Sequence, residues 1–406
     1  MKVRTFLLTA CFLVFLYPAS VDGNSVNYSF VLLPLALALI RGRCRRPSNL
    51  LLGFVAFYVF IYLLASVYQY ELYDEVERRA ISFLLFMSLF SYMFIEIDAE
   101  MIAAFKVSLV VISSLFSLWA IATFANSGVA ALDLEDAKNE VGSQRFGFVY
   151  LLALGALYLH PVRGFMYRVA KILACFVLVI GLALTFSRAA IIGCLVSLLG
   201  YMLWSLRYAF RRPARMLPRL IAVVAAVAVA VFLIMKFLPI VSDFFNQRLV
   251  ALLTDPDAVE STLSTPGTSG GERIYIWSQI LGYLAYNPLT GSGYVGVWSL
   301  KLFEGMSGSA HSQYADVLFR TGWVGFLIYL YLVYRIAWHL YRHEIGLFWG
   351  FMGVLAYGFF HETFKDSQGG FLLAFLIGMF SQTPGPVAGT GRGALEAPAE
   401  QLGYSA

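Results

Sequence analysis

Long apolar runs, separated by short polar and charged connections, fill most of this chain. A helix that crosses the hydrocarbon core of a bilayer needs about 20 predominantly apolar residues. Runs of this kind recur along the sequence, and none shows the strict alternation that is typical of strands. We therefore predict an all-α polytopic membrane protein with about twelve transmembrane helices, near residues 5–17, 26–40, 49–67, 80–95, 102–124, 146–160, 168–186, 188–206, 219–238, 320–338, 345–361 and 368–382.

The composition supports lipid as the solvent of this protein. Hydrophobic residues make up 60% of the 406 residues and charged residues 13%, whereas a soluble domain has about 25% charged residues. The net charge of +5 carries little information about nucleic acid, because in a membrane protein the position of the charges matters more than their sum. We expect the bilayer as a partner and no nucleic acid.

The distribution of charges predicts the orientation. Counted on the predicted spans, 18 of the 29 Lys and Arg residues fall on one side, and 18 of the 24 Asp and Glu residues fall on the other. Basic loops stay in the cytoplasm. Both termini should therefore be cytoplasmic, and the one large loop, 239–320, should be periplasmic. Residues 383–406, rich in Gly, Ala and Pro, are expected to form a disordered cytoplasmic tail.

The first predicted span has a second interpretation. Lys2 and Arg4, the apolar run Phe6–Tyr17 and the small residues Ala19 and Ser20 also describe a secretory signal peptide. Cleavage would leave eleven spans in the same orientation.

The large loop contains one segment with helical periodicity. It runs from Glu272 to Tyr286 and stops at Asn287-Pro288. Its apolar positions recur at helical spacing, which places one set of side chains on a single face. We expect an amphipathic helix at the membrane surface, with this face formed by Arg273, Trp277, Ile280 and Leu284.

A second feature is Arg188, which interrupts the apolar run from Ile172 to Trp204. As one helix this run would be about 50 Å long, too long for a core of about 30 Å. We therefore predict a tight hairpin with Arg188 at its external apex, in the first turn of a helix that Ser187 caps. A charge at this position is a functional candidate, although an arginine that snorkels to lipid headgroups is the alternative.

The predicted topology brings two helix N-termini to the external face, one at Arg188 and one at His311. Helix N-termini attract anions through their partial positive charge and unpaired N–H groups. Arg273 could reach the same place from the loop helix. Such an arrangement is what a phosphate or pyrophosphate site requires at the external surface of the membrane.

Several of these motifs together resemble a known family. The ordered set comprises Ser187-Arg188-Ala189, Glu272-Arg273 with Trp277, Asn287-Pro288, Gly291-Ser-Gly293, and His311-Ser312 with Gly322 and Gly325. The chain resembles the bacterial O-antigen ligase/polymerase superfamily over residues 146–382, which include the loop 239–320; residues 1–145, with helices one to five, resemble it in hydropathy alone. The family pattern has His-Asn where this chain has His311-Ser312.

The resemblance implies a GT-C-like fold and an inner-membrane enzyme whose site faces the periplasm. It implies transfer of a glycan from undecaprenyl pyrophosphate without metal or cofactor. The acceptor is a sugar hydroxyl of lipid A-core in the ligase branch and another lipid-linked glycan in the polymerase branch. Arg188 and Arg273 would stabilise the pyrophosphate charge, and His311 would orient or deprotonate the acceptor hydroxyl.

Further residues are candidates for substrate contact. Trp277, Tyr275, Tyr283 and Tyr294 could stack on sugar rings, although interfacial aromatics are more often membrane anchors. Tyr314 is a further candidate for substrate contact. His361 and Glu362, in a short external turn, could complete the site or form a solvated connection. Arg145 is a candidate in the preceding external loop, but the polymerase pattern of an arginine followed after ten residues by glycine starts neither there nor at Arg273.

Other function classes are weaker. Gly267-Thr-Ser-Gly270 fits an intramembrane serine protease motif, but its serine precedes charged residues in a loop. Asp255-Pro-Asp257 could bind a divalent metal, although a lone motif around proline is more often a turn. A transporter would place ionisable residues at mid-span, where this chain is almost entirely apolar. Between the two branches, the absent polymerase pattern favours the ligase.

Overall fold

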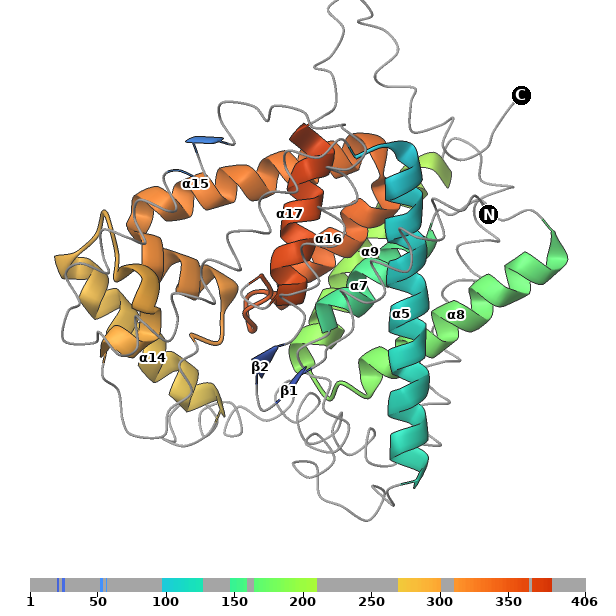
Figure 1. Cartoon of the computed structure of the whole chain (residues 1–406), viewed down its shortest axis with the longest axis horizontal. Coiled ribbons are helices and arrows are strands. Elements are labelled where there is room, and N and C mark those ends of the chain that lie inside the picture. Colours follow the sequence, from blue (N-terminus) through green and yellow to red (C-terminus); the bar gives the residue numbers. More distant parts are fainter. Residues whose placement is uncertain are drawn as a thin grey trace, which may run out of the picture. The chain divides into compact units, whose positions relative to one another are not determined.

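The computed structural model describes residues 20–21, 24–25, 52–53, 56, 97–126, 147–158, 164–209, 269–300, 310–364 and 367–381. Almost all of these residues are helical (Figure 1). The exception is a two-residue antiparallel pair, β1 (Ser20–Val21) with β2 (Asn24–Ser25). The all-α class predicted from the sequence is thus confirmed for the described part of the chain.

Seven of the twelve predicted spans coincide with helices in this part. Apart from three residues of 49–67, the other five spans lie outside the described residues, as do Arg145 and the tail 383–406. The helices that coincide with predicted spans are α5 (Ala99–Asn126), α7 (Gly147–Tyr158), α8 (Phe165–Ala183), α9 (Arg188–Ala209), α15 (Gln313–His343), α16 (Ile345–Tyr357) and α17 (Ser367–Ser381). The segment predicted as a loop helix forms α14 (Ser269–Tyr286), and the 3-10 segment η7 (Gly293–Leu300) follows it.

Four of the described helices are long and apolar enough to cross a membrane. They cover Ala99–Phe124, Phe165–Ala183, Arg188–Ser205 and Gln313–His343. Helices α7 and α16 are apolar but shorter. Lipid-facing side chains are apolar on such helices, and exposed large hydrophobic residues accordingly occur along all four. The arrangement is that of a multi-pass membrane protein.

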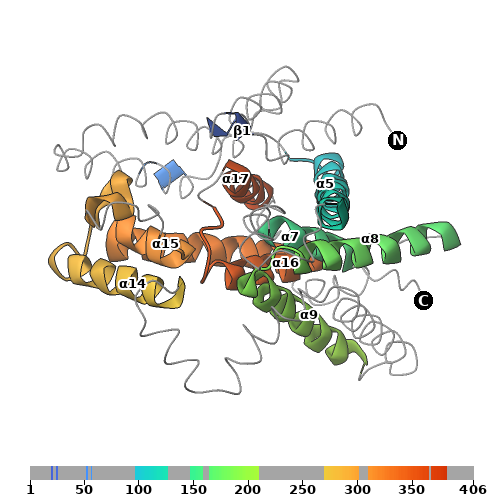
Figure 2. The same ribbon diagram turned by 90° about the horizontal axis from the view of Figure 1, so that it is seen from below.

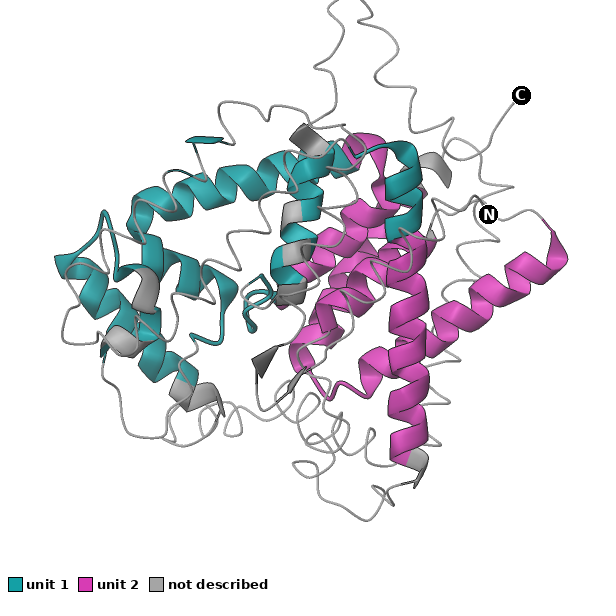
Figure 3. Ribbon diagram, in the orientation of Figure 1, with its two compact units in different colours: residues 1–105, 261–340, 358–391 teal, residues 106–260, 341–357, 392–406 magenta. Residues whose placement is uncertain are grey.

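The chain divides into two compact units (Figure 3). Unit 1 comprises residues 1–105, 261–340 and 358–391, and unit 2 comprises residues 106–260, 341–357 and 392–406. Among the described elements, unit 1 therefore contains α14, η7, α17 and most of α15. Unit 2 contains α7, α8, α9, α16 and most of α5.

In unit 2, α16 packs closely against α7 and α9 (Figure 2). Glycines make this approach possible. A Cβ atom at Gly155 of α7 would lie 2.6 Å from the backbone oxygen of Gly346, and one at Gly193 of α9 would lie 2.7 Å from that of Gly353. Small residues at the contact let helix backbones approach, which is how helices associate in a bilayer.

The hairpin predicted at Arg188 is confirmed. Helix α8 ends at Ala183 and α9 begins at Arg188, so four residues connect them. Within the connection Phe186 has a φ of +47°. The Ser187 hydroxyl accepts a hydrogen bond from the Ala190 N–H at 3.3 Å, which is the N-cap that the sequence predicted.

In unit 1, the start of α15 packs against one face of α14. Ile276, Ile280 and Leu284 of α14 are buried in one cluster with Val297, Ala310 and Phe319, and Trp277 packs at its edge. The face predicted from the periodicity is therefore covered by the protein itself. The face of α14 left exposed is the opposite one, which carries Ile274, Leu281 and Tyr286.

The turn that follows α14 is hydrogen-bonded to α15 at a break in that helix. Gly322 has a φ of +65° within the helix. The N–H of Trp323 donates to the Pro288 oxygen at 2.8 Å, and the N–H of Ser292 donates to the Phe319 oxygen at 2.7 Å. Helix α15 begins at Gln313, which confirms the helix N-terminus predicted at His311. The helix extends N-terminally beyond the predicted span 320–338 into the segment counted with the large loop, because Ser312 caps it.

Candidate functional site

His311 stands immediately before the N-cap of α15. Ser312 is that cap: its hydroxyl accepts from the Ala315 N–H at 3.4 Å, and its carbonyl accepts from the Asp316 N–H at 2.9 Å. Serine and asparagine are both strong N-cap residues. Ser312 therefore provides the capping chemistry that an asparagine would also supply at this position.

His311 has a left-handed backbone, with a φ of +51°. Among the described residues outside glycine, the same conformation occurs only at Phe186, two positions before Arg188. It costs an L-residue about 1–2 kcal/mol. Such strain persists where surrounding contacts over-determine the backbone, and it concentrates at functional sites.

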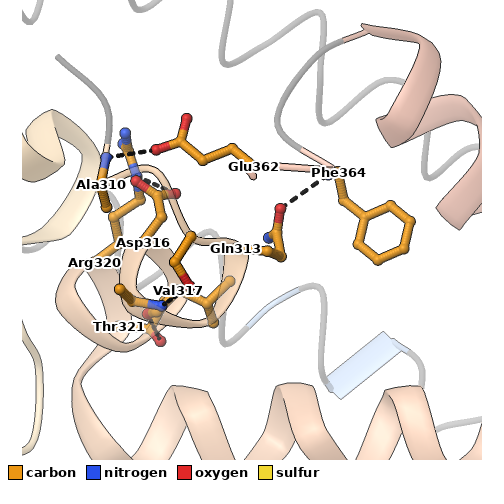
Figure 4. Close-up of polar contacts among 10 residues, drawn as sticks. Ala310, Gln313, Asp316, Val317, Arg320, Thr321, Glu362 and Phe364 are labelled. Carbon is orange, nitrogen blue, oxygen red and sulfur yellow. Dashed lines mark hydrogen bonds and ion pairs between the residues drawn. The ribbon is translucent and has the colours of Figure 1, made fainter. Parts of the chain in front are cut away.

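The turn after α16 is bonded to the start of α15 (Figure 4). The Gln313 N–H donates to the oxygens of Gly358 (2.8 Å) and His361 (3.1 Å). The Gln313 side-chain oxygen accepts from the Phe364 N–H at 2.9 Å. The predicted span 345–361 ends early, at Tyr357, because the following residues leave the helix to make this connection.

The turn brings His361 into the electrostatic environment of Arg273 and His311. Burial, together with the charges of Arg273 and then His311, lowers the pKa of His361 to about 3. A neutral imidazole can still donate or accept a hydrogen bond. Unit 1 thus assembles three nitrogen-rich side chains from α14, the start of α15 and the turn before α17.

Both polar atoms of the residue before His311 are bonded to side chains. The Ala310 N–H donates to a carboxylate oxygen of Glu362 at 2.7 Å (Figure 4). The Ala310 carbonyl accepts from the indole N–H of Trp277 at 2.9 Å. Ala310 itself is fully buried. Trp277 therefore bonds the peptide group that leads into His311, and Glu362 bonds the peptide group before it.

A buried ion pair beside this region was missed by the sequence analysis. The Arg320 Nε lies 2.9 Å from both carboxylate oxygens of Asp316, one helical turn away (Figure 4), and both side chains are at most 7% exposed. A Cβ at Gly296 would lie 2.6 Å from the Arg320 guanidinium carbon. Opposite charges four residues apart were the available signal. The pair anchors η7 against α15, so we assign it a structural role.

The aromatic candidates are placed differently from one another. Tyr275 is 38% exposed on the outer face of α14. Tyr314 packs against Phe359, with ring centroids 4.5 Å apart. Tyr283 packs edge-on against Phe319 at 5.2 Å. Trp277 bonds the peptide before His311 through its indole N–H.

Arg188 belongs to unit 2. It begins α9, and the first turn behind it is tightly packed, since a Cβ at Gly147 of α7 would lie 3.1 Å from the Ala190 Cβ and 2.9 Å from the Tyr357 ring. The start of α7, the start of α9 and the end of α16 therefore meet. This agrees with the topology count, which places all three ends on the external side.

A family model described as O-antigen ligase matches residues 173–330. This match covers less than half of the chain, and it supports the O-antigen ligase/polymerase superfamily that the ordered motifs resemble. It includes Arg188, Arg273 and His311, and it ends before His361 and Glu362. No curated protein matches the chain. The family match and the apolar helices together support a multi-pass membrane protein with a glycosyltransferase-like activity of the ligase or polymerase type.

Proposed function

We propose that the protein transfers a glycan from undecaprenyl pyrophosphate to a sugar hydroxyl of lipid A-core at the periplasmic face of the inner membrane. The observation that supports this most is that the chain at His311 is bonded both to the turn that carries His361 and to Trp277, one helical turn after Arg273 on α14. An arginine beside histidines at the start of a helix combines an anion site with a proton acceptor.

The donor end of the site needs positive charge more than it needs a base. Pyrophosphate is a good leaving group, and breaking the anomeric C–O bond leaves the bond's electrons on its oxygen. Guanidinium groups bind such oxygens in a bidentate manner. Arg273 and Arg188 would hold the pyrophosphate, the latter assisted by the N–H groups at the start of α9. No divalent metal is required for this charge stabilisation.

The acceptor end needs a group that takes a proton. As the acceptor oxygen forms its bond to the anomeric carbon, its proton passes to His311. His361 is a poor base, since its pKa is about 3, but its neutral ring can orient the acceptor through a hydrogen bond. We therefore assign the base to His311 and acceptor contact to His361. Arg145, Tyr275 and Tyr314 remain proposed contacts of the glycan.

A lipopolysaccharide gel of a deletion strain tests this function. Loss of all O-antigen from core, with accumulation of lipid-linked polymer, is the expected result for a ligase. Core that carries a single repeat unit would assign the protein to the polymerase branch instead. An unchanged gel together with unchanged exopolysaccharide would overturn the proposal.

A further inference from the structure

We propose that Trp277 and Glu362 are positioning residues for His311, which hold its left-handed backbone by bonding the residue before it. This inference rests on the proposed function, in which His311 is the base. It replaces sugar stacking as the role of Trp277, and it gives Glu362 a defined partner, the Ala310 N–H.

The first part of the argument is where the two side chains bond. The Trp277 indole donates to the Ala310 carbonyl at 2.9 Å. That carbonyl belongs to the peptide group whose nitrogen is the nitrogen of His311. The φ angle of His311 is the rotation that directly follows this peptide plane, so a bond that holds the plane restricts φ. The Glu362 carboxylate accepts a 2.7 Å hydrogen bond from the Ala310 N–H, and it thereby holds the peptide group on the other side of Ala310.

The second part is that the chain is also held after His311. Ser312 caps α15, and its hydroxyl lies 3.5 Å from the Gly358 carbonyl. The Gln313 N–H donates to the turn at Gly358 and His361. His311 is therefore the link between a bonded peptide and a capped helix, and its φ of +51° joins the two.

The third part concerns the surroundings of Trp277. Its ring packs at the edge of the cluster formed by Ile276, Ile280 and Phe319. Its N–H is already used by a backbone carbonyl at good geometry. A side chain that is packed on one side and bonded at its only polar atom is suited to fixing a backbone.

Replacement of the indole tests the inference directly. Trp277→Phe keeps an aromatic ring and removes the N–H. We expect kcat for transfer to fall at least about tenfold, because a displacement of about 1 Å in a reacting group costs up to ~100-fold, while KM for donor and acceptor changes little. The probes are the lipid-linked glycan and the lipopolysaccharide core extracted from the deletion strain. Trp323→Phe, at an exposed tryptophan of α15, is the matched control and should keep wild-type kcat.

Two variants of Glu362 separate its acceptor oxygen from its charge. Glu362→Gln retains an oxygen that can accept from the Ala310 N–H, whereas Glu362→Ala does not. We expect a loss of a few fold in kcat for Glu362→Gln and of at least about tenfold for Glu362→Ala. Equal losses for both variants would mean that the carboxylate charge matters, and would overturn the role proposed for Glu362.

A double-mutant cycle with His311 decides whether Trp277 acts through it. In a His311→Ala background, Trp277→Phe should change the residual rate less than about twofold. A Trp277→Phe enzyme with wild-type kcat, or losses that multiply in the double variant, would refute the positioning role while leaving the proposed function intact. Wild-type activity in His311→Ala alone would instead refute His311 as the base.

Discussion

The ammonium group of Lys106 lies 2.9 Å from a carboxylate oxygen of Glu344, although 238 positions separate the two residues. Both belong to unit 2. The count of spans assigns the start of the fifth span and the connection between the tenth and eleventh to the cytoplasmic side. The contact agrees with that count, since residues on opposite sides of a bilayer about 30 Å thick could not meet.

The same count makes a prediction for labelling. In a variant lacking the native cysteines, Gln279→Cys on the exposed face of α14 should react with a membrane-impermeant maleimide in intact spheroplasts. Arg342→Cys, exposed near Glu344, should react only after lysis. The reverse pattern would place the site in the cytoplasm and contradict the proposed function.

The two arginines proposed to bind pyrophosphate should not tolerate lysine. Arg188→Lys and Arg273→Lys keep the charge but lose the planar fork, so transfer should fall at least about tenfold while membrane insertion is unchanged. Arg335→Lys is the matched control, because that guanidinium bonds the Tyr331 hydroxyl. Near-normal transfer in Arg188→Lys would reduce that residue to a headgroup anchor.

His361 should make stability depend on pH. Its pKa is lowered to about 3 in the folded protein, against about 6.5 in an unfolded chain. Below pH 6.5 the unfolded chain therefore binds a proton that the folded protein does not, and stability falls as the pH drops towards 3. The melting temperature in detergent should fall by several degrees more between pH 7.5 and pH 5 in the wild type than in His361→Gln. An identical pH dependence in both would show that His361 is not held neutral.

The break in α15 should require glycine. A Cβ at Gly322 would meet the Leu289 oxygen, and its φ of +65° is unfavourable for other residues. Gly322→Ala should therefore destabilise the protein by more than about 1 kcal/mol. Gly282→Ala is the contrasting change, because nothing lies within 4 Å of its Cβ, and alanine there should stabilise α14 by about 0.5–1 kcal/mol. Thermal unfolding of both variants measures the difference.

Metal independence can be checked with purified protein. Transfer should continue in excess EDTA, and the double variant Asp255→Asn with Asp257→Asn, at positions outside the described residues, should retain activity. Activity that disappears on chelation and returns with magnesium or manganese would restore the Asp-Pro-Asp motif as a candidate metal site.

Features that depend on local sequence could be predicted without the structure. Lipid excludes unpaired backbone groups, so spanning segments must be helices, and apolar runs indicate where they lie. The hairpin at Arg188 follows from the length of one run, and the cap at Ser187 from a hydroxyl just before a helix. The buried face of α14 follows from spacing alone.

Other features depend on residues far apart in the chain, and only the tertiary structure decided them. The sequence suggested that Trp277 stacks on a sugar ring, yet its N–H bonds the Ala310 carbonyl. Glu362, 52 positions away from Ala310, accepts from the N–H of that residue. Neither contact has a sequence signature, because any backbone amide can accept or donate. The left-handed φ of His311 has none either, since histidine prefers other conformations and adopts this one where contacts on both sides hold the chain. The sequence thus determined which helices form and which residues carry charge, while packing determined which backbone atoms those side chains bond.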